Sequence, residues 1–89
     1  MRLDLFLKNS RVCPRRTIAQ KLCDAGLVFL NGAPAKSAHP VKPNDEITVR
    51  RKNKITTLKV LAVPTARHTS RVDAKDLVEL VVEQEIDDE

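Results

Sequence analysis

The chain has 89 residues, which is enough for one domain with a single modest core and leaves nothing over for a second lobe. Its formal net charge of +4 hides a segregation, because residues 1–72 hold fifteen Lys and Arg against four Asp and Glu, a net of +11, whereas residues 73–89 hold eight carboxylates and one lysine, a net of −7. The basic block favours nucleic acid as the partner, since each Lys or Arg that contacts a phosphate releases condensed counterions. The sequence contains neither an apolar run of ~20 residues nor a signal peptide, which predicts a soluble, cytoplasmic protein with no membrane partner.

A short amphipathic helix is expected close to the N-terminus. Leu3, Phe6 and Leu7 recur at helical spacing and predict a helix over residues 3–9 with one apolar face. Basic side chains lie off that face.

A second helix is expected over residues 14–25. Pro14 suits its first turn, because the missing N–H of proline costs nothing there. Gly26 follows the last periodic residue and is expected in the left-handed region that ends a helix. The side chains that we expect to face inward are those of Ile18, Ala19, Leu22, Cys23 and Ala25.

A β-hairpin is expected immediately afterwards. Residues 28–30 predict a strand, and Asn31-Gly32 is the strongest short-range signal for a two-residue turn. Residues 33–36 return as an edge piece, because Pro34 cannot donate to a central ladder.

Two further strands are expected to form a second hairpin. Residues 46–50 alternate, with Ile47 and Val49 facing inward. A basic tip over residues 51–54 leads into a returning strand over residues 55–63.

The acidic end is expected to contain a helix. Residues 73–83 carry Ala74, Leu77, Val78 and Val81 at helical spacing, with an aspartate placed to cap the helix. Val81-Val82 also suits a strand, so both alternatives stand for this segment.

The connection between the two N-terminal helices gathers basic side chains. Arg11 lies past the first helix, while Arg15 and Arg16 fall in the first turn of the second, so the three are expected to converge. The planar guanidinium group of arginine can donate two parallel hydrogen bonds to one phosphate. Asp4 is expected to orient Arg2 or Arg16, or to place negative charge at the first turn. The side chains predicted to bind RNA are Arg2, Lys8, Arg11, Arg15, Arg16, Lys21, Lys36, Lys42, Arg50 and Arg51.

Each of these cations could instead be a solvent-exposed charge that binds no ligand. Five bases at the helices against so few acids favour a binding surface over a solvated basic face. For the bases of the sheet and hairpin tip, solvated charge is as good an explanation as RNA contact. These are Lys36, Lys42, Arg50, Arg51, Lys52 and Lys54.

The few aromatic residues indicate what kind of RNA is bound. Proteins that bind single strands stack bases on Phe, Tyr or Trp. The chain has only Phe6 and Phe29, both of which we expect to face the core. Structured RNA, recognised by shape and phosphate geometry, is therefore the expected ligand.

An ordered set of residues in the first half of the chain carries a family resemblance. The set is Arg2-Leu3-Asp4, Phe6-Leu7, Arg11, Arg16, Ala19, Gly26, Val28, Asn31-Gly32, Lys36, Val41-Lys42-Pro43 and Asp45. It resembles the S4 RNA-binding domain over residues 1–50. The resemblance implies an α+β fold of the S4 αL type, with two short N-terminal helices packed beside a small antiparallel sheet. Arg15 departs from the family pattern, because many S4 domains have a serine there.

The stand-alone domain is most similar to the small ribosome-associated members of that family, which include quality-control factors and a heat-shock relative. We therefore divide the chain into an S4 domain, residues 1–64, and a linker, short helix and acidic tail, residues 65–89. The resemblance implies binding to ribosomal RNA of obstructed large subunits and to peptidyl-tRNA. It also implies that a quality-control elongation factor acts on the same subunit, so that the stalled chain is elongated or released. We expect a monomer.

Other functions would also use some of these features. A heat-shock-type large-subunit recycling factor or an rRNA-binding assembly factor belongs to the same class, and a helix-turn-helix DNA regulator would use similar helices. A protein-interaction module would dock through the acidic end. Cys13 and Cys23 are expected as free thiols, and with His39 and His68 they lack the spacing of a zinc site. Neither a cofactor, a metal nor an enzymatic activity is expected.

Overall fold

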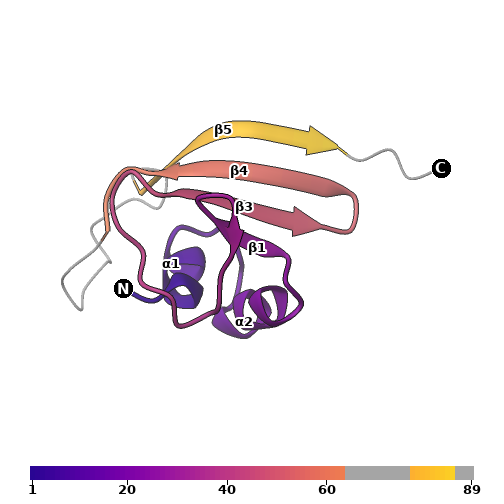
Figure 1. Ribbon diagram of the computed structural model, residues 1–89, viewed down its shortest axis with the longest axis horizontal. Coiled ribbons are helices and arrows are strands. Elements are labelled where there is room, and N and C mark those ends of the chain that lie inside the picture. The colour runs from indigo at the N-terminus through magenta and orange to yellow at the C-terminus, as the bar shows by residue number, and fades with distance from the viewer. Residues whose placement is uncertain (64–76, 86–89) are drawn as a thin grey trace.

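Two helices and a five-stranded antiparallel sheet make up the computed structural model, which describes residues 1–63 and 77–85. The strands lie in the order β2-β1-β3-β4-β5, and every neighbouring pair is antiparallel (Figure 1). The elements are α1 (Leu3–Asn9), α2 (Arg16–Asp24), β1 (Val28–Leu30), β2 (Ala33–Pro34), β3 (Glu46–Arg51), β4 (Lys54–Val60) and β5 (Val78–Glu85). The α+β class expected from the sequence is confirmed.

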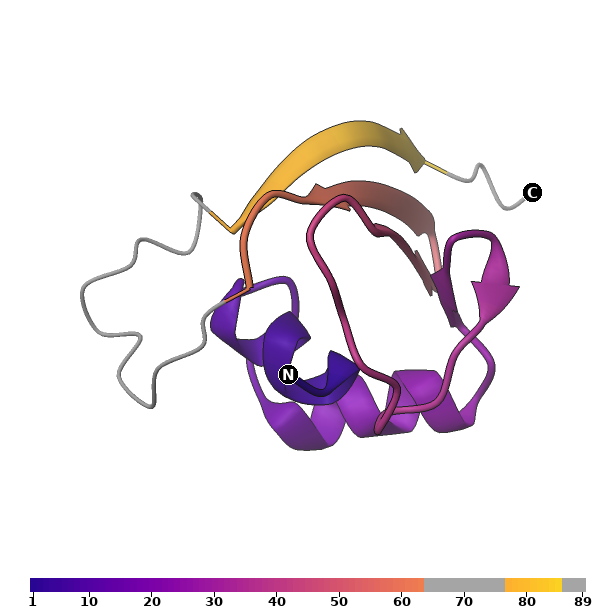
Figure 2. The ribbon, with the colours of Figure 1, turned by 60° about the vertical axis from the view of Figure 1, so that its left-hand side comes forward.

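Both helices lie on the same face of the sheet, which curves above them (Figure 2). Leu3, Phe6 and Leu7 on α1 have no exposed area, as the helical spacing predicted. They pack with Ile47 and Val49 of β3, which also have none. Burial of each such side chain stabilises the fold by roughly 1.5–3 kcal/mol.

Helix α2 begins later than the sequence predicted. Its N-cap is Arg15, which is extended at φ −140° and ψ 148°, so Pro14 lies before the helix and not in its first turn. The reason is Cys13, whose amide donates to the Leu7 carbonyl at 3.0 Å and whose side chain is buried. Because the Cys13 side chain is buried in the core, the chain stays non-helical through Pro14, and α2 begins only after Arg15.

Fewer side chains of α2 are buried than the sequence predicted. Ala19 and Cys23 are buried and Leu22 is half-buried, but Ile18 and Ala25 are exposed, so these two predictions were wrong. A nine-residue helix that covers one edge of a small core buries only the central stripe of its apolar face.

The first hairpin forms as predicted. Asn31 and Gly32 have φ of 52° and 86°, the pair of positive values that a type I′ turn requires. The side chain of Asn31 adds two contacts, donating to Asp45 Oδ1 at 3.1 Å and accepting from the Glu46 amide at 2.9 Å. The turn thereby fixes the hairpin to the start of β3, and β2 with Pro34 lies at the sheet edge.

Phe29 does not face the core, contrary to expectation. It pairs with Thr48 of β3 and with Pro34 of β2, between Val28 and Leu30, which are both buried. Because successive side chains on a strand point to opposite faces, Phe29 lies on the face that the helices leave uncovered (Figure 1), where it is half-buried.

The C-terminal segment is a strand over residues 78–85, so the helix expected over 73–83 was wrong there. Residues 73–76 of that prediction, and residues 86–89 of the predicted acidic tail, lie outside the described part. Strand β5 pairs with β4 from Val78 opposite Val60 to Glu85 opposite Lys54, with a bulge beside Leu58. The β-branched valines that left the strand alternative open suit this pairing. Strand β4 ends at Val60, short of the predicted residue 63.

Candidate nucleic-acid interface

A buried carboxylate joins the two arginines at the helix starts. Asp4, on the first turn of α1, has no exposed area. It accepts hydrogen bonds from the Leu5 amide at 2.8 Å and from Gln20 Nε2 at 2.8 Å. Arg16 Nε donates to Asp4 Oδ2 at 3.1 Å, and Arg2 reaches both carboxylate oxygens through Nε at 3.2 Å and Nη2 at 3.3 Å.

The contacts of Asp4 keep it ionised. Burial by itself would raise the pKa of this carboxyl, but the hydrogen bonds from Gln20, Arg16 and the Leu5 amide, together with the positive charge of Arg16, outweigh burial and lower the pKa. The negative charge is therefore present at neutral pH, and it holds both guanidinium groups.

The two arginines keep part of their donor capacity for a ligand. The side chains of Arg2 and Arg16 are 47% and 43% exposed. A guanidinium has five N–H donors, so Arg16, which contacts Asp4 through Nε, keeps both terminal nitrogens. Arg2 keeps Nη1. The sequence predicted that Asp4 would orient one arginine, and the structure shows it contacting both.

The loop before β3 is fixed to the N-terminus beside Arg2. Arg2 forms an isolated antiparallel bridge with Pro40, and the Val41 amide donates to the Met1 carbonyl at 3.0 Å. Lys42 follows directly and is exposed, as is Lys36 on the same loop. Lys42 is thus within two residues of the Arg2 bridge.

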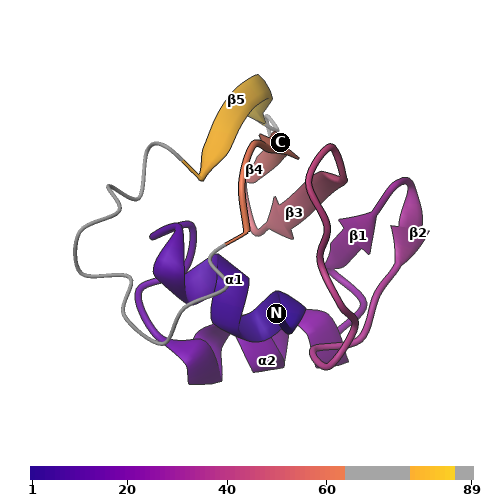
Figure 3. The same ribbon diagram turned by 90° about the vertical axis from the view of Figure 1, so that its left-hand side faces the viewer.

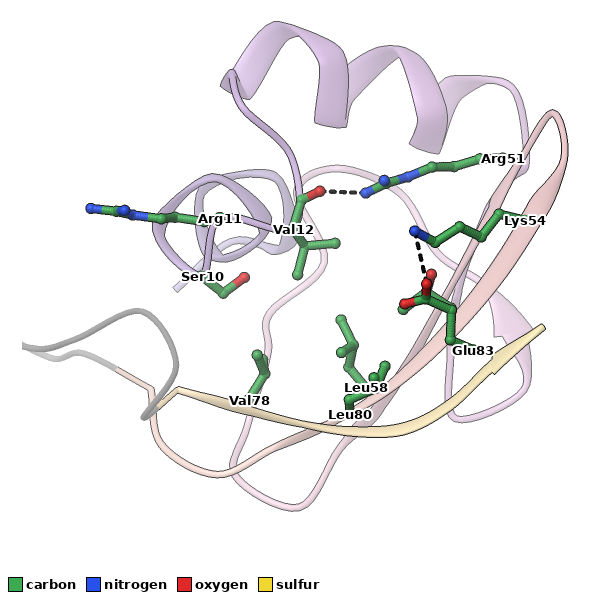
Figure 4. A pocket seen from close by; sticks show the side chains of 10 residues that line it. Ser10, Arg11, Val12, Arg51, Lys54, Leu58, Val78, Leu80 and Glu83 are labelled. Atoms are coloured by element: carbon green, nitrogen blue, oxygen red, sulfur yellow. Dashed lines mark hydrogen bonds and ion pairs between the residues drawn. The ribbon is translucent and has the colours of Figure 1, made fainter. Parts of the chain in front are cut away.

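The remaining helix cations are exposed but do not share in the Asp4 cluster. Arg11 has a left-handed backbone at φ 62° and lies on the connection between the two helices, beside Val12 (Figure 4). Arg15 is the exposed N-cap of α2. Lys8 and Lys21 lie in the last turns of α1 and α2, where a positive charge also favours the helix dipole. Their contact with RNA stays a prediction.

Arg51 has a structural contact that the sequence did not indicate. Its Nη2 donates to the Val12 carbonyl, which ties the end of β3 to the inter-helix connection (Figure 4). Its neighbour Arg50 is exposed and lies opposite Ile55, on the uncovered face of the sheet. Adjacent positions on one strand thus send these arginines to opposite faces.

Gln20 was not predicted as part of the site. It stands four residues after Arg16 on α2, so both side chains project from one face of the helix and meet Asp4 together. This i, i+4 spacing was the signal in the sequence that could have identified it.

The cysteines are free thiols, as expected, and are buried. Burial raises the pKa of Cys13 although Arg51 opposes the effect, and burial with the nearby charge of Asp4 raises the pKa of Cys23 to about 11. Both thiols therefore stay protonated at neutral pH, which makes them poor nucleophiles and poor metal ligands. Within residues 1–63 and 77–85, no cluster of three or more metal-binding side chains occurs.

The described helices are short, and none has the length and apolar character needed to cross a membrane.

Comparison with known proteins places this arrangement in a family. The model of the S4 domain matches residues 1–47. Among solved structures, the trimeric Vibrio cholerae Heat Shock Protein 15 superposes with a TM-score of 0.78 at 26% identity, over 91% of this chain and 81% of that one. The solution structure of hypothetical protein HP1423 gives 0.77 at 30% identity, over 92% and 98%.

Curated relatives extend over nearly the whole chain. The RQC P-site tRNA stabilizing factor of Streptococcus pneumoniae is 38% identical over 99% of this chain and 98% of its own. The protein of the same name from Bacillus subtilis is 38% identical over 97% and 98%, and that of Helicobacter pylori strain J99 is 36% identical over 82% and 87%. The chain therefore belongs to the S4 domain family, among the proteins named RQC P-site tRNA stabilizing factors.

Proposed function

We propose that the protein binds the large ribosomal subunit in ribosome-associated quality control and stabilises peptidyl-tRNA in the P site, so that the stalled chain can be elongated or released. The main structural support for the proposal is the pair of exposed arginines, Arg2 and Arg16, that form ion pairs with buried Asp4. Membership of the family supports it, since the relatives are named RQC P-site tRNA stabilizing factors. The protein acts by binding, not by catalysis.

The arginine pair suits phosphate groups of a folded RNA. Two guanidinium groups fixed to one carboxylate lose less conformational freedom on binding than free side chains would. The terminal nitrogens that Asp4 leaves open can donate to phosphate oxygens as charge-assisted hydrogen bonds. We assign further RNA contacts to the other predicted cations, all of them in the described part of the chain and none in contact with Asp4: Lys8, Arg11, Arg15, Lys21, Lys36, Lys42, Arg50 and Arg51.

Membership of the family suggests the partners that we propose. Ribosomal RNA of the large subunit and the peptidyl-tRNA are the nucleic acids, and the quality-control elongation factor acts on the same subunit. The protein works in the cytoplasm as a monomer, with residues 1–64 as its RNA-binding part. A heat-shock-type recycling role on the large subunit is the second candidate, which the likeness to Heat Shock Protein 15 favours.

A sedimentation experiment tests the proposal. Purified protein is mixed with large subunits that carry peptidyl-tRNA in the P site and with subunits from which the tRNA has been released, and both are pelleted. We expect tighter association with the tRNA-bearing subunits. Equal association with both would contradict tRNA stabilisation and favour binding to ribosomal RNA alone.

A further inference from the structure

Strand β5 leaves one edge of the sheet open. It is the outermost of the five strands and has eight residues, and within residues 1–63 and 77–85 no other strand pairs with its outer side. An edge strand presents unpaired N–H and C=O groups to any chain that can extend beside it. The opposite edge is β2, which has two residues and contains Pro34, so it offers little to pair with.

The open strand also exposes apolar side chains. Leu80, Val81 and Val82 are 56%, 50% and 47% exposed. Leu80 lies opposite Leu58, a buried residue on the helical side of the sheet, whereas Val82 lies opposite Thr57 on the other side. An edge strand with no binding partner is expected to expose polar or charged side chains. The exposed apolar side chains of β5 on both faces of the sheet therefore indicate a binding surface.

A groove runs beside the inner side of β5 (Figure 4). It has a volume of about 320 Å³ and an apolar wall formed by Val12, Leu58, Val78 and Leu80, which suits apolar side chains. The rest of its lining includes the cations Arg11, Arg51 and Lys54, so the basic side chains of an occupant would have to lie outside the groove. The ion pair between Lys54 Nζ and Glu83 Oε1, at 2.9 Å, closes one end. A strand added to the edge of β5 would place every second side chain next to this groove.

The charge of β5 identifies the chemistry of the occupant. The strand carries Glu79, Glu83 and Glu85 and has no basic residue, in a chain of net charge +4. Of these three glutamates, only Glu83 has a basic partner within 4.0 Å in the described part of the chain. Glu79 and Glu85 are exposed and lie opposite Lys59 and Lys54 of β4. Such an edge repels RNA and also repels a second β5, since two copies would bring six glutamates together. It attracts an extended segment rich in lysine or arginine.

We propose that the outer edge of β5 docks an extended basic segment of a partner protein, which adds a sixth strand to the sheet. Apolar side chains of that segment lie against Leu80 and the groove on the inner face, and basic ones lie beside Glu79 on the other face. Backbone hydrogen bonds hold the segment, and the side chains select it. In Figures 1 and 3, β5 forms the edge of the sheet that lies farthest from α2, so the added strand would lie away from the Arg2–Arg16 pair. The groove beside it is also lined by Arg11 and Arg51, so only the arginine pair, and not every predicted RNA contact, is separate from the docked segment.

The test uses the full chain and an eight-residue peptide that alternates lysine and valine, with blocked ends. We expect binding that weakens with salt and that slows hydrogen exchange of the β5 amides. The same peptide with a methyl group on every backbone nitrogen keeps its charge and side chains but has no N–H, and we expect it to bind at least about tenfold more weakly. Equal binding of the methylated peptide would overturn the proposal.

A matched pair of variants separates strand addition from simple charge attraction. Leu80→Glu and Leu61→Glu each add one negative charge at an exposed leucine, but Leu61 lies outside the strands, at 47% exposure. We expect Leu80→Glu to bind the peptide about threefold to tenfold more weakly than Leu61→Glu, because the apolar contact is lost. Tighter or equal binding by Leu80→Glu would overturn the proposal.

Two further results bear on the same surface. Arg2→Ala together with Arg16→Ala should leave peptide binding unchanged, so that failure of the RNA assignment and failure of this one are told apart. Sedimentation of the free protein should show no self-association. A dimer that the peptide dissociates would mean that a second copy, not a basic segment, occupies the edge, and would overturn the proposal.

Discussion

A single buried carboxylate controls the geometry of two arginines that are fourteen positions apart in the chain. Asp4 accepts donors from α1, from α2 and from the residue before α1, so the relative placement of the two helices and the aim of the guanidinium groups depend on the same side chain. No buried side-chain nitrogen or oxygen in the described residues lacks a partner. At this scale stability and binding cannot be varied independently.

Asp4→Asn tests this coupling. Because the new amide NH₂ would face donors from Gln20 and Arg16, we expect a loss of about 1–3 kcal/mol in the free energy of unfolding. RNA affinity, measured under conditions where both proteins are folded, should also fall. Urea melts monitored by circular dichroism measure the first effect, and full stability with normal RNA affinity would contradict the role given to Asp4.

The pH dependence of stability provides a second check on Asp4. Its pKa is lower in the folded protein than its ordinary value of 3.8, so the native state favours the ionised form. The associated stability is present above pH ~4 and is lost as the pH falls through the folded pKa. We expect the wild type to lose stability below pH 4 more steeply than Asp4→Asn. Parallel acid melts of the two proteins would contradict this.

Replacement of single cations separates the proposed site from general surface charge. Arg16→Ala removes an arginine held by Asp4, and we expect it to weaken large-subunit binding by about 1–3 kcal/mol. Lys52→Ala removes an exposed lysine at the β3–β4 turn and should cost under about 1 kcal/mol. Pelleting assays compare the two. Equal losses would mean that charge alone, and not the arginine pair, determines affinity.

Among the structural elements, the first hairpin depends on its turn residues. Gly32 has φ of +86°, and a Cβ added there would meet no atom within 4 Å. The cost of Gly32→Val is therefore backbone strain and not a clash, and we expect a lower urea midpoint, whereas Gly32→Asn should cost less because asparagine tolerates positive φ. RNA binding should follow the folded fraction. Loss of binding at full stability would place the turn itself at the RNA.

The elements that local signals determine were the ones predicted well. Helix α1 and the Asn31-Gly32 turn follow from spacing and turn chemistry within a few residues. The start of α2 depends on burial of Cys13, and the strand β5 depends on pairing with β4, which is distant in the sequence. Such tertiary contacts can decide the secondary structure of a segment against the helical spacing of its apolar residues. They cannot be deduced from the sequence of that segment alone.

The same limit applied to the candidate site. The sequence predicted that Asp4 would orient Arg2 or Arg16, or would place negative charge at the first turn, but not that it would contact both arginines. It did not indicate that Arg51 would be tied to a backbone carbonyl, or that Phe29 would lie on the uncovered sheet face. Both outcomes depend on how strands meet helices and on strand register, which is set by the whole sheet.

At the scale of the whole molecule, charge is divided between two surfaces. Cations lie around the helices, on the loop before β3 and on the β3–β4 hairpin, whereas the described acidic residues of the C-terminal segment lie on β5, at the edge of the sheet (Figure 3). A protein divided in this way orients itself in the field of a large polyanion before contact is made. The Debye length of about 10 Å at 0.1 M salt limits this steering to short range.

Salt titration measures how many phosphates the arginine pair meets. The logarithm of the binding constant should fall linearly with the logarithm of salt concentration, with a slope of about −0.9 for each phosphate neutralised on a duplex. If Arg2 and Arg16 each meet a phosphate of structured RNA, we expect Arg2→Ala and Arg16→Ala to reduce the slope by about 1 each and by about 2 together. Lys59→Ala, an exposed lysine on the uncovered face of β4, is the matched control and should leave the slope unchanged. The measurement uses one RNA, at least four salt concentrations and fluorescence anisotropy. A slope that is the same in wild type and in the double variant would show that these arginines do not contact phosphate, even if the affinity had fallen.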